Sequence, residues 1–64
     1  KNNNMSKFTL QLQIQKELNQ LNSNPNYYGS ENQIENEIYI SSTSKVEMLY
    51  NETIEEYYKR LLKY

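Results

Sequence analysis

The chain has 64 residues, of which 36% are hydrophobic, and its seven basic and eight acidic side chains give a formal net charge of −1. Cysteine and histidine are absent, which excludes disulfide bonds and the usual zinc sites. The balanced charge predicts no nucleic-acid binding, and the lack of a long apolar run predicts no membrane span. A chain this small and polar is expected to lean on another protein chain or on further sequence for its stability.

The chain opens with an asparagine-rich stretch, for which we predict a disordered edge over 1–5. The remainder, 6–64, is expected to be one small helical segment or domain fragment. Because the first residue is Lys1 rather than methionine, we expect a processed chain or a fragment of a larger protein. The frequent Asn, Lys, Ile and Tyr have AT-rich codons, a bias typical of proteins from AT-rich genomes.

The first ordered element is expected over 7–22, where two periodicities compete. One set of apolar residues alternates with polar ones, as in a half-buried strand: Phe8, Leu10, Leu12 and Ile14. Another set follows the period of a helix: Leu10, Ile14, Leu18 and Leu21. Good helix formers fill the segment, and the residue before Pro25 avoids the helical region, which ends the element. We predict a helix over 7–22, with a strand over 8–15 as the alternative.

The middle of the chain is polar and holds the single proline and the single glycine. Its composition predicts a long loop over 22–36, longer than a simple connector needs. The β-branched and aromatic residues of 37–41 then predict a short strand, which a turn over 41–43 follows.

The last third of the chain is amphipathic and has two sequence signals for a helix start, the capping boxes of 44–47 and 53–56. We predict one helix over 45–63. The alternative is a strand over 45–50 and a shorter helix that begins after Thr53. The expected core combines the stripes of all elements: Leu10, Ile14, Leu18, Leu21, Ile38, Ile40, Val46, Leu49, Tyr50, Ile54, Tyr57, Tyr58, Leu61 and Leu62.

The composition argues against catalysis, because His, Cys and Asp are all absent. Ser42 and Lys45 have the Ser-x-x-Lys spacing that lets a lysine activate a serine. A serine-rich turn that enters a capped helix explains the same residues. The paired glutamates of 52–56 are typical of a solvated helix face. We therefore predict that the chain is not an enzyme and has no catalytic, cofactor-binding or metal-binding residue.

The sequence thus predicts a mainly α fold: two helices joined by a long polar loop and one short strand, within a larger or multi-chain assembly. The alternative is an α+β fold of βαββα order. The expected function is a protein–protein interaction or assembly segment that binds another protein or a second copy. Tyrosine is enriched at interfaces, and the predicted partner-binding stripe is Tyr50, Ile54, Tyr57, Tyr58, Leu61 and Tyr64. The alternative function is a non-catalytic piece of a processed enzyme, such as an inhibitory prosegment or a clipped α+β fragment.

Overall fold

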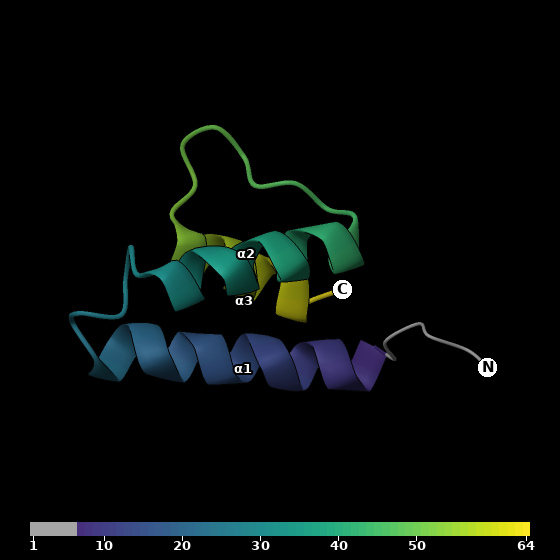
Figure 1. Cartoon of the computed structure of the whole chain (residues 1–64). Helices are drawn as coiled ribbons and strands as arrows, with labels where there is room; N and C mark the ends of the chain where they lie inside the picture. Colours follow the sequence, from purple (N-terminus) through teal and green to yellow (C-terminus); the bar gives the residue numbers. More distant parts are fainter. Residues whose placement is uncertain (1–6) are drawn as a thin grey trace.

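A computed structural model describes residues 7–64, which form three α-helices and no strand: α1 (Lys7–Ser23), α2 (Glu31–Ser44) and α3 (Ile54–Leu62). α1 and α2 run antiparallel, and α3 lies behind α2 and packs on α1 as well (Figure 1). The mainly α class is therefore confirmed. The strand predicted over 37–41 is wrong, since these residues lie inside α2, and the βαββα alternative fails for the same described range. The edge predicted over 1–5 lies outside the described residues.

α1 follows the helical period rather than the strand period, and the prediction of a helix over 7–22 is confirmed. Ile14, Glu17 and Leu18 are its buried residues, spaced three and four apart as one helix face requires. The helix ends where Ser23 Oγ donates to the Asn19 carbonyl oxygen at 2.6 Å. Asn24 begins the turn that follows, and its Oδ1 accepts from the Asn26 backbone N–H at 3.1 Å.

α2 begins inside the predicted loop because Ser30 and Gln33 form a helix start. The Ser30 hydroxyl oxygen accepts from the Gln33 backbone N–H at 3.2 Å, and Gln33 Oε1 accepts from the Gly29 N–H at 3.0 Å. This Ser-x-x-Gln spacing is the signal that the loop prediction missed. The loop is consequently short, and half of the predicted 22–36 segment is helical.

The helix predicted over 45–63 begins nine residues late, at Ile54. Lys45 has a left-handed backbone (φ 61°) and ends α2, so a helix cannot run on through it. Thr53 and Glu56 form the capping box of α3, with backbone-to-side-chain distances of 2.9 and 3.1 Å. The segment 45–53 is an arched connection that is neither helix nor strand (Figure 1).

The core lies between the three helices and contains two tyrosines among its seven buried hydrophobic residues: Ile14, Leu18, Ile40, Ile54, Tyr57, Tyr58 and Leu61. All seven belong to the predicted core. Three other predicted core residues are exposed instead, Ile38 by 60%, Leu49 by 57% and Tyr50 completely. Ile38 is exposed because it lies in a helix rather than in the predicted strand. Leu49 and Tyr50 are exposed because the segment 45–53 is not helical.

Candidate functional site

The predicted partner-binding stripe divides into a buried and an exposed part. Ile54, Tyr57, Tyr58 and Leu61 lie in the chain's own core and are at most 6% exposed, so they cannot contact a partner in this fold. Tyr50 and Tyr64 are exposed, but they lie at the arched connection and at the end of the described chain. The first four side chains are buried because α3 packs against the apolar face of α1.

Glu17 is the buried charged residue at the centre of a polar network between α1, the first turn and α2. Its side chain is 2% exposed. The Tyr27 hydroxyl donates to the Glu17 carboxylate at 2.8 Å, and Asn36 Nδ2 donates to the same carboxylate at 2.7 Å. Burial raises the pKa of Tyr27, and the neighbouring carboxylate raises it further. These bonds satisfy a carboxylate that would otherwise be costly to bury, so the network joins three parts of the chain.

Tyr57 and Tyr58 are fully buried neighbours whose hydroxyl groups differ in their bonding. The Tyr57 hydroxyl donates to the Val46 carbonyl oxygen and so anchors the arched connection on α3. The Tyr58 hydroxyl has no hydrogen-bond partner among the described residues. Burial raises the pKa of Tyr58 well above its ordinary value, and the charge of Glu17 adds to this effect. Because both tyrosines are fully buried, their hydroxyl groups affect the stability of the fold and are not accessible at the surface.

Arg60 and Glu52 form a two-bond ion pair, with 2.7 Å from Nε to Oε2 and 2.8 Å from Nη2 to Oε1. The Arg60 guanidinium also donates to the Glu47 carbonyl oxygen at 2.8 Å and lies 5.5 Å from the centre of the Tyr57 ring. Its hydrogen bonds lower the pKa of the Glu52 carboxyl to about 2. The pair holds the arched connection against α3.

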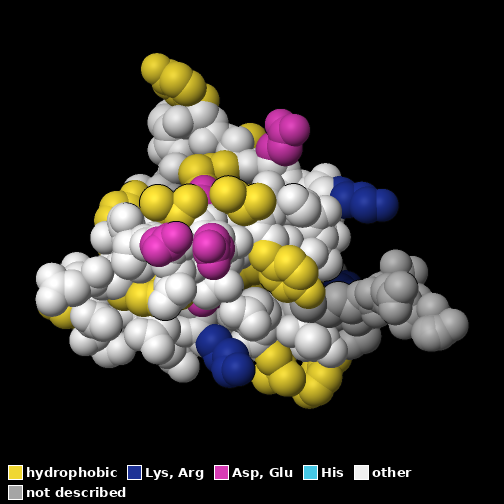
Figure 2. Space-filling model, in the orientation of Figure 1, with side chains coloured by type: hydrophobic (Ala, Val, Ile, Leu, Met, Phe, Trp, Pro, Cys, Tyr) yellow, Lys and Arg dark blue, Asp and Glu magenta, His cyan; other side chains and the backbone are white. Residues whose placement is uncertain are grey.

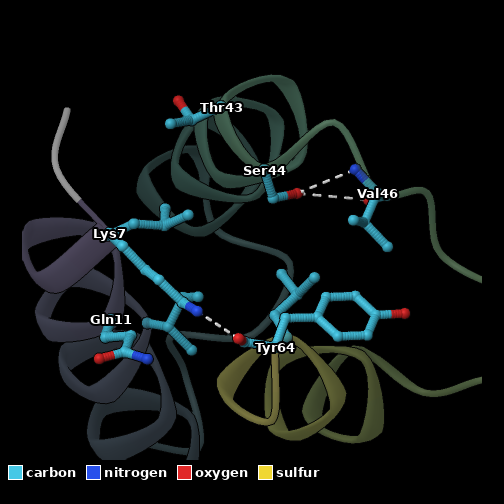
Figure 3. Close-up of a pocket in the computed structure, with 9 residues that line it drawn as sticks. Lys7, Gln11, Thr43, Ser44, Val46 and Tyr64 are labelled. Atoms are coloured by element: carbon cyan, nitrogen blue, oxygen red, sulfur yellow. Dashed lines mark hydrogen bonds between the residues drawn. The ribbon is translucent and has the colours of Figure 1, made fainter. Parts of the chain in front are cut away.

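A groove of about 280 Å³ opens where α1 begins and α2 and α3 end (Figure 3). Its floor includes Leu10, Ile14 and Leu61, and at its rim Lys7 Nζ donates to the backbone oxygen of Tyr64. Ser44 Oγ lies at the wall and bonds to backbone atoms of α2 and Val46. Among the described residues, no side chain forms a hydrogen bond with this hydroxyl.

No other chemistry-bearing cluster emerges from residues 7–64. Lys45 lies one residue beyond α2 and makes no hydrogen bond to Ser42. Within this range, no three acidic side chains gather to hold a metal ion. No helix in the described part of the chain is long and apolar enough to cross a membrane.

The outer face of α2 carries exposed isoleucines that the core does not use. Ile34 and Ile38, one helical turn apart, are 47% and 60% exposed. Glu31 precedes them in the first turn and Lys45 follows at the helix end, and both are exposed. These four residues are named here the outer α2 face. Figure 2 shows hydrophobic side chains gathered along α2 with acidic side chains directly beneath them.

In comparisons with known proteins, no protein-family model, no curated protein and no solved structure matches this chain. The outer α2 face was missed by the sequence interpretation because Ile34 was placed in a loop and Ile38 in a strand. The i,i+4 spacing of the two isoleucines after the Ser30–Gln33 helix start was the signal that could have found it.

Proposed function

We propose that the protein is an interaction module that binds a protein chain through the outer α2 face. The observation that carries this proposal is the exposure of Ile34 and Ile38, side by side on one helix, in a chain with a small core. Because each side chain is already about half-buried, covering the exposed half contributes about 1 kcal/mol per isoleucine. Two neighbouring isoleucines thus supply a useful part of a binding energy.

The position of these residues suits helix recognition. Side chains at i and i+4 of a helix are read together by a partner groove or a partner helix. Ile40, two residues beyond Ile38, is completely buried and holds α2 on the core. The helix is therefore fixed from behind, which keeps the exposed pair ordered before a partner arrives and lowers the entropic cost of binding.

The alternative function, a non-catalytic piece of a processed enzyme, was tied to an α+β order. Residues 7–64 contain no strand, so this order is not present in the described chain. No contact or cavity described above favours that alternative over an interaction module.

The experiment is site-specific photo-crosslinking in cells that produce the protein. A photoreactive amino acid replaces Ile38 in one variant and Leu12 in the control, since Leu12 is 49% exposed on a different helix, α1. We expect one adduct of defined mass from position 38 and none from position 12. Equal labelling at both positions, or no adduct at position 38, would refute the proposal.

A further inference from the structure

We propose that the partner is a second copy of this chain, which binds antiparallel along the outer α2 face with a two-fold axis at Ile38. The inference rests on the proposed function and names its partner. It is carried by the order of the side chains on α2, which is self-complementary when one copy is turned around.

The outer α2 face is one continuous stripe. Glu31, Ile34 and Ile38 are three and four residues apart, so they point within an arc of about 60° on the helix. Lys45 follows seven residues after Ile38 as the left-handed cap that ends the helix. Within the helix, spacings of three and four are those of a seam between two packed helices.

The charges at the two ends of the stripe are opposite and unpaired. Glu31 lies in the first turn of α2, whereas Lys45 is its C-terminal cap. The described residues contain one ion pair, Glu52 with Arg60, which leaves Glu31 and Lys45 without an ionic partner in the range 7–64. Fourteen residues of helix separate them by about 21 Å, too far to pair within one copy.

An antiparallel second copy brings these charges together. Because Glu31 and Lys45 both lie seven residues from Ile38, a two-fold axis there places Glu31 of each copy opposite Lys45 of the other. A parallel copy would place Glu31 beside Glu31 and Lys45 beside Lys45, which is repulsive. The charges therefore select the antiparallel arrangement.

The sizes of the side chains agree with the same arrangement. On the axis, Ile38 meets its own copy, and Ile34 meets Ser42 of the second copy. Ile34 lies in the second turn of α2, and the small residues of 41–44 form its last turn. A large side chain thus faces a small one, which lets the two helices approach closely. The contact is small, so we infer a weak dimer that forms as the concentration rises.

The first test uses the absence of cysteine from the sequence. In Ile38→Cys, the new thiol is the single one in the chain, and the two-fold axis places it against its own copy. We expect a disulfide-linked dimer under mild oxidation, seen by non-reducing electrophoresis. Leu12→Cys, at an exposed position of α1, is the control and should stay monomeric. Failure of Ile38→Cys to cross-link, or equal cross-linking of both variants, would overturn the proposal.

The second test exchanges the charges, with sedimentation equilibrium as the readout. Glu31→Lys or Lys45→Glu alone should weaken the dimer by roughly two- to thirtyfold, since two exposed ion pairs are lost. The double variant should restore the affinity because the pairs form again with reversed signs. Each exchange also opposes the helix dipole. If the charges acted within one copy alone, the double variant would have the lowest dimer affinity of the three variants, and that result would refute the proposed arrangement.

The two proposals fail in distinguishable ways. A photo-adduct from position 38 with twice the mass of the chain supports both proposals. An adduct with a different protein, together with no Ile38→Cys dimer, keeps the interaction module and overturns self-association. No adduct and no dimer overturns both proposals.

Discussion

Replacing Tyr57 and Tyr58 by phenylalanine, one at a time, gives opposite effects on stability although the chemical change is identical. Both side chains are fully buried and their rings are 5.8 Å apart. The difference lies in the hydroxyl groups. That of Tyr57 donates to the Val46 carbonyl oxygen, whereas that of Tyr58 has no partner among the described residues.

The magnitude follows from the cost of each hydroxyl. A buried polar group without a partner costs about 1–3 kcal/mol, so its removal in Tyr58→Phe should stabilise the fold by about 1 kcal/mol. Tyr57→Phe loses a hydrogen bond worth about 0.5–1.5 kcal/mol. In this variant, the Val46 carbonyl oxygen keeps the long hydrogen bond from Ser44 Oγ, at 3.4 Å. The two variants should therefore differ by about 2 kcal/mol, or roughly 8–16 °C in melting temperature.

Thermal unfolding followed by circular dichroism measures this difference, and the dependence on pH supplies a second readout. The pKa of Tyr58 is raised above its ordinary 10.0, so this residue binds its proton more tightly in the folded state. Its contribution to stability is complete below pH 10 and is lost as the pH rises further. Tyr58→Phe should make this alkaline loss of stability smaller, while Tyr57→Phe should leave the contribution of Tyr58 in place.

One result would refute the reasoning. If Tyr58→Phe lowered the melting temperature as much as Tyr57→Phe does, the Tyr58 hydroxyl would have to make a hydrogen bond in the folded protein. The assignment of a cost to that group would then be wrong, and so would the expected gain in stability.

Two further predictions concern α3 and its contacts. Leu61→Ala removes a side chain that is 5% exposed and should destabilise the fold by about 2–5 kcal/mol, whereas Lys63→Ala on the surface should change stability by less than about 0.5 kcal/mol; equal thermal melts would contradict this. The Arg60 hydrogen bonds lower the pKa of Glu52 from 4.5 to about 2, so its stabilisation is complete above pH 4.5 and is lost as the pH falls towards 2. Glu52→Gln should be less stable at neutral pH and should lack this acid-dependent loss, and acid titrations of the two proteins check it.

Local patterns in the sequence were sufficient for α1 and for the inner face of α3. In α1 the spacing of Ile14 and Leu18 matches one helix face, and good helix formers fill the rest of the segment. In α3 the buried residues are three and four apart, as the sequence predicts, although the start at the Thr53–Glu56 capping box was the alternative to the predicted start at 45. The residues that form each of these signals lie within a few positions of one another, so the signals can be recognised in the sequence alone.

Four residues of the predicted partner-binding stripe, Ile54, Tyr57, Tyr58 and Leu61, are buried within the chain itself. An apolar stripe on a helix predicts that its side chains are buried, but it does not tell whether they pack against the same chain or against another one. For Tyr57 and Leu61, the cover is the apolar face of α1 in the same chain. Contacts between segments this far apart in sequence leave no mark in the periodicity of either one.

The sequence by itself determined the class of the fold, the place of α1 and most of the core, because helix periodicity and capping act over one or two turns. The tertiary structure decided that 37–41 is helical, although its β-branched residues favour a strand. Burying Ile40 against α1 and α3 outweighs that weak local preference. The same packing places Ile34 and Ile38 on the surface. Burial of Ile40 fixes the rotation of α2 about its axis, and the helix period then directs these two side chains outwards.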